Sequence, residues 1–268
     1  LCAGLITMKR LLLPFLLATG LSVSAQKDNQ MAPVKAPQPV KPVNPILRGE
    51  QVSGKIDTIA TPDPLTPGRS QWTILNPNGS VKAQGFMRDG KRDGVWREYA
   101  SSNNVLVKVE EYRDGHKNGA VLAFSAVGQV NLNETYLNDT LQGPRLTYSN
   151  NGRIKTMEHY VKGVLQGNRR SFYDDSKLQE DANYKNGVRD GVSKWFSSAG
   201  KPSIEYTYVN GELSGPAKLY DENGDLKQEG SFIAGDEDGE WKVYENKVLV
   251  KKLYYKKGEI TREVPVKK

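Results

Sequence analysis

The chain has 268 residues, of which 37% are hydrophobic and 26% charged, and its formal net charge is +7. This mildly basic balance argues against nucleic acid as the partner, and two histidines with one cysteine argue against a histidine–cysteine metal centre. The modest apolar fraction suits a thin, single-layer sheet better than a thick core.

The N-terminal residues 1–25 are expected to be a signal peptide, in which residues 1–7 are extra residues ahead of the true start. A positively charged beginning is followed by the apolar run Leu11–Leu21 and by the small residues Val23–Ala25, a typical cleavage site. The run is shorter than the about 20 residues that a membrane-spanning helix needs. The mature chain is therefore expected to begin at Gln26, to lack a transmembrane segment, and to be periplasmic or secreted.

Residues 26–69 are rich in proline, most densely over 32–45. Proline lacks a backbone donor and favours the extended polyproline conformation, so this stretch is expected to be a disordered linker. The remaining residues, 70–268, are expected to form one repeat domain.

Glycines recur through this domain at a first step of 25 residues and then at steps of 24. Each is followed five residues later by an aromatic residue. Such a period is typical of an array in which one small unit is stacked on itself. The glycines are Gly94, Gly119, Gly143, Gly167, Gly191, Gly215 and Gly239, and the aromatics are Tyr99, Phe124, Tyr148, Phe172, Phe196, Tyr220 and Tyr244.

Two turn signals divide each unit into two strands. One is a doublet such as Asn186–Gly187 or Asn210–Gly211, and the other lies mid-unit, as at Asn223–Gly224. Both are expected to be tight type I′ turns, which need positive φ at both central residues. The second strand alternates with a period of two, whereas apolar residues on both faces of the first suggest a bend or bulge. The sequence therefore predicts an all-β protein, an elongated antiparallel sheet of about eight tandem 24-residue hairpins.

This pattern resembles the MORN repeat, and more closely its bacterial variant labelled antitoxin of the YwqK type. The resemblance implies a non-enzymatic scaffold that mediates protein–protein or envelope and membrane-surface contacts. The label also leaves open an antitoxin or immunity protein that sequesters a toxin. The motifs that carry it are Gly94–Tyr99, Gly239–Tyr244, Tyr184–Gly187 and Tyr208–Gly211.

We expect no catalytic, cofactor-binding or metal-binding residues, and therefore no enzyme. His116 and His159 have no companion ligand at metal-binding spacing. Asp181, Glu205 and Glu229 recur at one position of the unit, where a solvated face is a simpler interpretation than an acid pair around a cleft.

An interaction surface is expected where aromatic and basic residues recur. Tryptophans could stack sugars, which leaves carbohydrate binding as an alternative, and the basic residues could meet a protein partner or an anionic envelope surface. The C-terminal stretch is the most basic region. The candidate residues are Trp72, Trp96, Arg145, Arg169, Arg170, Lys194, Trp195, Trp241, Lys251, Lys252 and Tyr254.

If the leader is correctly identified, mass spectrometry of the envelope or secreted fraction should find Gln26 at the N-terminus. Recovery of the intact chain from the cytosol would contradict export.

Overall fold

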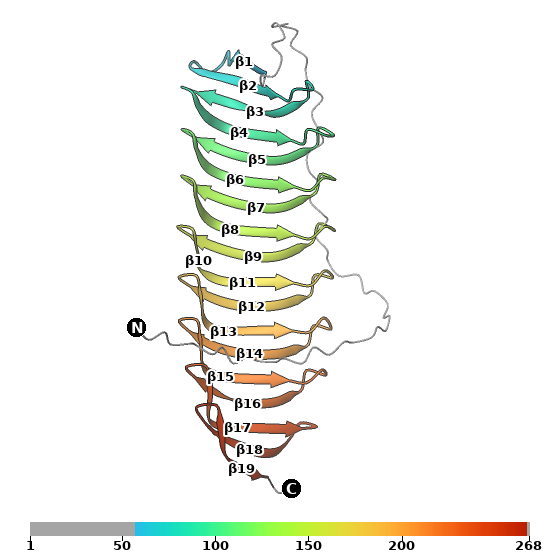
Figure 1. The fold of residues 1–268 in the computed structure, drawn as a ribbon, viewed down its shortest axis with the longest axis vertical. Helices are drawn as coiled ribbons and strands as arrows, with labels where there is room; N and C mark the ends of the chain where they lie inside the picture. Colours follow the sequence, from blue (N-terminus) through green and yellow to red (C-terminus); the bar gives the residue numbers. More distant parts are fainter. Residues whose placement is uncertain (1–56, 267–268) are drawn as a thin grey trace, which may run out of the picture. The chain divides into compact units, whose positions relative to one another are not determined.

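The computed structural model describes residues 57–266, which form one long antiparallel sheet that does not close (Figure 1). Consecutive strands pair with one another, except that β9 pairs with both β10 and β11, which are the two halves of one interrupted strand. This confirms the all-β prediction, with eight hairpins from β2 to β18. The strands are β1 (Thr58–Pro62), β2 (Arg69–Leu75), β3 (Val81–Arg88), β4 (Lys91–Tyr99), β5 (Leu106–Arg113), β6 (His116–Phe124), β7 (Val130–Leu137), β8 (Thr140–Tyr148), β9 (Ile154–Val161), β10 (Val164–Leu165), β11 (Gly167–Phe172), β12 (Leu178–Lys185), β13 (Val188–Phe196), β14 (Pro202–Val209), β15 (Glu212–Tyr220), β16 (Leu226–Ile233), β17 (Asp236–Glu245), β18 (Val248–Lys256) and β19 (Glu259–Pro265).

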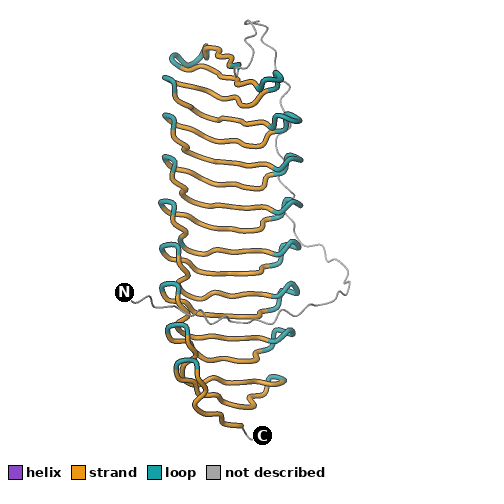
Figure 2. Tube along the Cα trace, in the orientation of Figure 1, coloured by secondary structure: helices purple, strands orange, loops and turns teal. Residues whose placement is uncertain are grey.

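The turns gather along two edges of the sheet, on the left and right of Figure 2. On the left edge, which we call the doublet edge, both central residues have positive φ, as the type I′ prediction requires. In the turn between β12 and β13, for example, Asn186 has φ 52° and Gly187 has φ 82°.

Most mid-unit turns on the opposite edge differ from the prediction, although the last one, Asn246–Lys247, has positive φ at both central residues. In the turn between β8 and β9 only Gly152 has positive φ, and its N–H donates to the carbonyl of Ser149 at 2.9 Å. This is a longer loop built around a type I turn and closed by one left-handed residue. The extra residue of the 25-residue step lies in such a loop, Ala100–Val105, which is one residue longer than Ser125–Gln129 in the next unit.

The repeated glycine of each unit lies in a bulge of the first strand. Ala182 pairs with Ser193 and Tyr184 pairs with Arg189, so β13 has extra residues around Gly191, whose φ is 100°. A side chain is strained at such a φ, which explains why glycine recurs here. The expected bend or bulge in the first strand is confirmed.

Alternation along the strands gives the sheet two different faces. The core face carries a continuous row of cross-strand neighbours, in which Trp96, Ala217 and Trp241 are buried and Ser193 is fully buried. The opposite face, which we call the open face, carries exposed side chains such as Met157. The core row is formed by Trp72, Gly85, Trp96, Glu110, Val121, Glu134, Arg145, Glu158, Arg169, Ala182, Ser193, Tyr206, Ala217, Gly230, Trp241 and Leu253.

Two tryptophans of the core row lie on glycines of the neighbouring strand. A Cβ added at Gly85 would overlap the ring of Trp96, and one added at Gly230 would overlap the ring of Trp241. Each indole N–H also donates to a carbonyl of that strand, Trp96 to Phe86 at 2.8 Å and Trp241 to Ser231 at 3.2 Å. The indole rings therefore cover bare backbone and supply the missing side-chain surface.

The sheet begins earlier than the sequence indicated. β1 lies inside the segment expected to be a linker, and it pairs with β2 residue for residue, from Thr58 opposite Ile74 to Pro62 opposite Ser70. The turn between them is held by the carboxylate of Asp63, which is 3.6 Å from the guanidinium of Arg69. The expected signal peptide and the rest of the linker, up to residue 56, lie outside the described residues.

Replacing Gly230 with alanine should destabilise the sheet by about 1–3 kcal/mol, because the new methyl group forces the Trp241 ring out of place. Urea unfolding followed by tryptophan fluorescence measures the effect. Ser231→Ala is the matched control, since the Trp241 N–H bonds to the backbone carbonyl of Ser231, which this change keeps. Equal unfolding midpoints for the two variants would contradict the ring-on-glycine packing.

Candidate interaction surfaces

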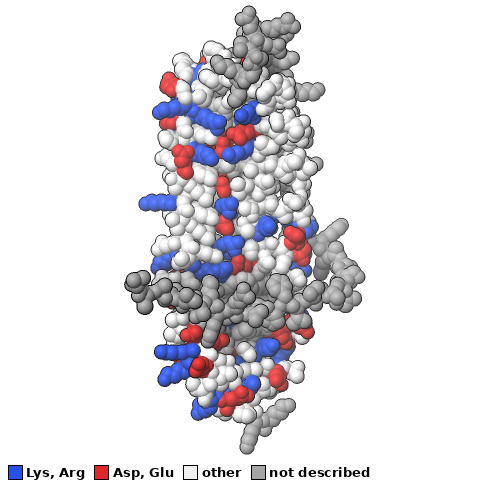
Figure 3. Space-filling model, viewed as in Figure 1, with Lys and Arg blue, Asp and Glu red and all other residues white. Residues whose placement is uncertain are grey.

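The middle of the core face carries a row of alternating acidic and basic side chains. Glu134, Glu158 and Glu180 alternate with Arg145, Arg169 and Arg189, and we call these six residues the charged ladder. Figure 3 shows acidic and basic side chains alternating in a narrow line along the sheet. Strand pairing places Arg145 directly opposite Glu134 and Glu158, whereas Arg169 and Arg189 reach Glu180 diagonally on the same face.

Each arginine between two glutamates bonds to both. Arg145 Nε lies 2.7 Å from Glu134 Oε1 and its Nη1 lies 2.9 Å from Glu158 Oε2. Arg169 joins Glu158 to Glu180 in the same way, with Nε 3.0 Å from Glu158 Oε1. Arg189 ends the ladder on Glu180.

The glutamates of the ladder are largely withdrawn from water, with side-chain exposures of 9–11%, whereas Arg145 and Arg169 are 31% and 24% exposed. Buried ion pairs add little net stability, because desolvation offsets their attraction, but losing one partner leaves a costly unpaired charge. Removing one partner of the ladder would therefore be costly, although the intact pairs add little net stability.

A related cluster lies at Glu110, one hairpin before the ladder. Burial alone would raise the pKa of Glu110, but hydrogen bonds from Lys108, Lys117 and Tyr112 outweigh it and lower the pKa to about 2. For Glu158, burial likewise opposes the bonds from two arginines, and the net pKa is lowered. Both carboxylates therefore stay ionised in the folded chain at neutral pH.

Arg189 also lies among three aromatic rings. Its guanidinium carbon is 5.7 Å from the ring centre of Tyr184, 5.0 Å from that of Trp195 and 5.5 Å from that of Tyr208. These cation–π contacts cover part of Trp195. Next to it is a hollow lined by Lys155, Thr156, Arg169, Ser171, Phe172, Gln179, Glu180 and Trp195.

The structure does not bring the predicted surface residues together. Trp96 and Trp241 are buried in the core row, and Arg145 and Arg169 belong to the charged ladder, because their position in the unit falls on the core face. Trp72 is half-buried on the same face.

Trp195 also lies on the core face, opposite Glu180, and the remaining candidates lie on the open face or on the last hairpin. Arg170 and Lys194 are half-exposed on the open face. On the last hairpin Lys252 contacts Glu240, to which Tyr254 also donates, and Lys251 contacts Glu263.

The open face has an apolar half and a charged half along the same row of positions. From β5 to β9 the row carries Val109, Leu122, Leu146 and Met157, interrupted by Asn133. From β11 onward basic and acidic residues alternate. They are Arg170, Asp181, Lys194, Glu205, Lys218, Glu229 and Lys242.

The aromatic residue five positions after each glycine extends the apolar half. Phe124 is buried with Leu106 and Val130, and Tyr99 and Tyr148 pack against them. In the charged half Tyr244 instead donates to Glu229, at 2.8 Å. The aromatic residues that follow the glycines therefore pack within the open face and stabilise the sheet.

A second exposed apolar surface runs along the doublet edge, and our sequence analysis missed it. Branched aliphatic side chains flank five consecutive type I′ turns there, and all are 39–60% exposed. The sequence did carry a signal for it, because apolar residues recur beside the turn doublets with the 24-residue period of the hairpins. We call this surface the aliphatic ridge, and it consists of Leu137, Val161, Val164, Val188, Val209 and Ile233.

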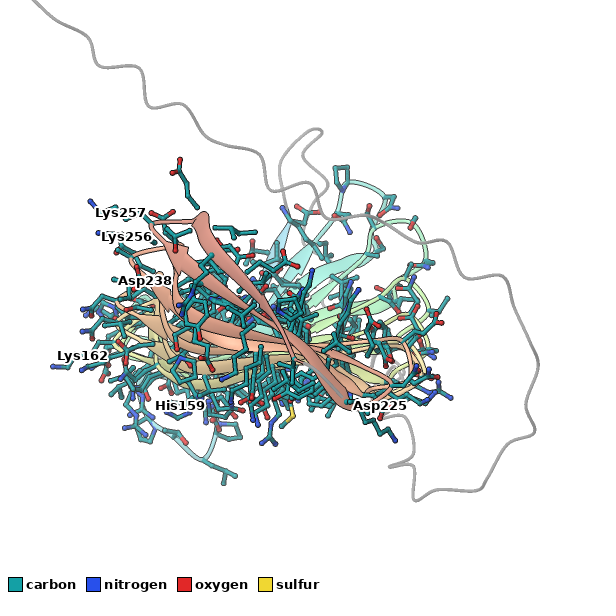
Figure 4. All side chains as sticks on the ribbon, turned by 90° about the horizontal axis from the view of Figure 1, so that it is seen from below. His159, Lys162, Asp225, Asp238, Lys256 and Lys257 are labelled. Atoms are coloured by element: carbon teal, nitrogen blue, oxygen red, sulfur yellow. The ribbon has the colours of Figure 1, made fainter. Side chains whose placement is uncertain are left out.

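Over residues 57–266, no group of three or more His, Cys, Asp or Glu side chains is placed to hold a metal ion. Within the same range, no helix is long and apolar enough to cross a membrane. His116 contacts Asp139, with Nδ1 2.6 Å from Oδ2, and so ties two successive turns together. His159 projects from the open face (Figure 4).

The pattern for the MORN repeat variant matches the chain at residues 165–186, 189–210 and 213–234. These segments start 24 residues apart, in step with the hairpins, and each spans one strand pair. Over residues 165–234 the sheet is therefore similar to a MORN-repeat β-sheet scaffold, a class that is generally non-catalytic. A search of curated proteins found no match.

The paired glutamates predict a loss of stability in acid. A carboxyl group whose pKa is lower in the folded than in the unfolded chain stabilises fully above its unfolded pKa, and this contribution disappears as the pH falls through the folded pKa. For Glu110 these limits are 4.5 and about 2. The urea midpoint should therefore fall between about pH 5 and pH 2.

The fall should be shallower in Glu110→Gln, which removes one titrating group. Glu222→Gln is the control, because this carboxylate is exposed in the turn after β15. Identical slopes for the two variants would show that Glu110 does not contribute.

Proposed function

We propose that the chain is a non-catalytic, exported scaffold that binds a protein partner across its open face. The observation that carries this proposal is the two-part row on that face, in which an apolar half continues into a half of alternating charges. A surface of this kind suits a partner that has an apolar patch beside its own charged groups.

The ion pairs of the open face are weak enough to be replaced by ion pairs with another protein. Arg170 lies 3.1 Å from Asp181 and Lys194 lies 3.1 Å from Glu205, and both basic side chains are about half exposed. Exposed pairs contribute only about 0–1 kcal/mol, so replacing one with a bond to another protein costs little. Specificity would come from the order of the charges and affinity from the apolar half.

The charged ladder on the core face also argues against a catalytic function. Glu158 and Glu180 are each held by two arginines and Glu134 by one, and Tyr136 and Tyr160 donate to Glu134 and Glu158. A general acid or base needs a carboxylate that can take and release a proton near neutral pH, and the lowered pKa of Glu158 opposes this.

Two other functions remain as alternatives. If the partner is a toxin, the same open face would serve an immunity protein, and the expected signal peptide would fit an exported toxin. The hollow beside Trp195 favours a carbohydrate instead, because an aromatic ring next to Gln179 and Lys155 could stack a sugar and bond its hydroxyl groups.

Site-specific photo-crosslinking in the producing cells separates these functions. A photoreactive residue at Met157 or Lys194 should trap a protein in the envelope fraction, whereas one at Glu222 should not. The identity of the trapped protein distinguishes a toxin from another partner. A crosslink formed only from Gln179, to cell-wall glycan, would favour the carbohydrate function. The absence of any protein adduct at Met157 and Lys194 would overturn the proposal.

Binding should also depend on both halves of the row. We expect Leu122→Glu and the double change Arg170→Glu with Lys194→Glu each to weaken the trapped complex by roughly tenfold or more. Lys201→Glu, an exposed charge in the turn before β14, is the control. Equal crosslinking in all three proteins would contradict a contact across the open face.

A further inference from the structure

The core face carries a second row of side chains, which lies beside the core row toward the doublet edge. Five successive hairpins each place one half-buried tyrosine in it. The first three donate their hydroxyl groups to glutamates of the core row, as Tyr136 does to Glu134 at 3.0 Å, and Arg189 lies between the rings of the last two. We call this the tyrosine row, and it consists of Tyr112, Tyr136, Tyr160, Tyr184 and Tyr208.

The tyrosine row is regular and has a definite end. Neighbouring strands lie about 4.8 Å apart, so one tyrosine per hairpin gives a repeat of about 9.6 Å. In the next hairpin the same position holds Phe232, which is only 8% exposed because Tyr206 and Trp241 pack against it. Between the tyrosines the facing strands contribute Lys117, Leu141, Leu165 and Arg189.

The segment 33–45 lies outside the described residues, but its sequence has a period of three. It reads Pro-Val-Lys, Ala-Pro-Gln, Pro-Val-Lys, Pro-Val-Asn and a final Pro. In a polyproline helix, with three residues per turn, residues three apart share one side. Two sides of this helix would then carry only proline, valine and alanine. The third side would be polar, with Lys35, Gln38, Lys41 and Asn44.

The two periods match. A polyproline helix rises about 3.1 Å per residue and so repeats at about 9.3 Å, against about 9.6 Å for the hairpins. The difference adds up to only about 1 Å over four turns. Aromatic-lined grooves are a common binding surface for such helices, because the proline rings pack against the aromatic rings. The two apolar sides of the segment can therefore straddle the tyrosines while its polar side stays in water.

The connection to the sheet is long enough for this contact. Residues 46–57 join Pro45 to β1, which lies at one end of the stack of strands (Figure 1). Extended, they span about 40 Å, at about 3.3 Å per residue. Tyr112 in β5 is four strands from β1, or about 19 Å along the stack. Pro45 can therefore reach Tyr112, and Pro33, four turns further on, then lies near Tyr208.

We propose that the chain's own segment 33–45 binds along the tyrosine row as a polyproline helix, with Pro45 near Tyr112 and Pro33 near Tyr208. Because the segment is tethered, its effective concentration at the row is of millimolar order, so weak contacts suffice. The segment occupies the core face and leaves the open face free. The proposal is therefore independent of partner binding on the open face.

Photo-crosslinking of the purified chain tests the contact. A photoreactive residue in place of Val40 should attach to the tyrosine row around Tyr160, because this register places Pro39 beside that ring. Lys41 is the matched control, since it is the next residue but belongs to the polar side, and it should give several-fold fewer adducts. Equal yields from the two positions would overturn the proposal, as would adducts of position 40 with the open face or no adduct at all.

The same experiment identifies whose segment is bound. If unlabelled and isotope-labelled chains are mixed before illumination, each adduct should join two peptides of the same label. Adducts that join an unlabelled to a labelled peptide would show that the segment of a second copy occupies the row, and would overturn binding within one chain.

Nitration of tyrosine by tetranitromethane, followed by mass spectrometry, measures how far the segment covers the row. Val40→Asp with Val43→Asp places charges on an apolar side, so Tyr136 and Tyr160 should react several-fold faster than in the unaltered chain. Gln38→Asp with Asn44→Asp adds the same charge on the polar side and should leave both rates unchanged.

Each tyrosine is compared with itself across the variants, and Tyr220, outside the row, is the internal reference. All four substitutions lie outside the sheet, so the fold should be retained, and an unchanged Tyr220 rate checks this. Unchanged rates at Tyr136 and Tyr160 in the valine variant, or an equal rise in both variants, would overturn the proposal.

Discussion

The contact between cross-strand neighbours in the core row is the interaction on which this sheet depends. A single layer has no second sheet or helix against which to pack, so each side chain of the row must be covered by those one strand away. No hairpin can satisfy this alone, because half of its neighbours belong to the next unit. The bulge at each glycine bends the strand locally, and side chains on either side of it reach the row.

The row meets this requirement in two chemically different ways. Near Trp96 and Trp241 a large ring lies over the bare backbone of a glycine, and the contact is apolar. Between Glu134 and Arg189 long charged side chains reach across to one another, and their stems cover the strands. The contacts between rings and glycines do not depend on pH, whereas the charged ladder requires ionised glutamates. The two parts of the sheet should therefore differ in their response to pH.

A consequence of this division is that the surfaces left for partners are not those with the most conspicuous residues. Tryptophan and arginine, which usually dominate binding sites, are largely used inside the core row. The open face and the doublet edge instead offer aliphatic residues and weakly held charges. Both surfaces repeat with the period of the hairpins, so a partner meets a regular series of contacts along the sheet.

The sequence by itself determined the period, the number of hairpins and the type I′ turns of the doublet edge, because these depend on local backbone preferences that glycine and asparagine reveal directly. It also indicated the bulged first strand. Only the tertiary structure decided which face each residue occupies, since every bulge changes the alternation of the residues that follow it. The pairing of Arg145 and Arg169 with glutamates, and the exposure of Val188, likewise depend on neighbours about 10–25 residues away, whose distance in space no local pattern specifies.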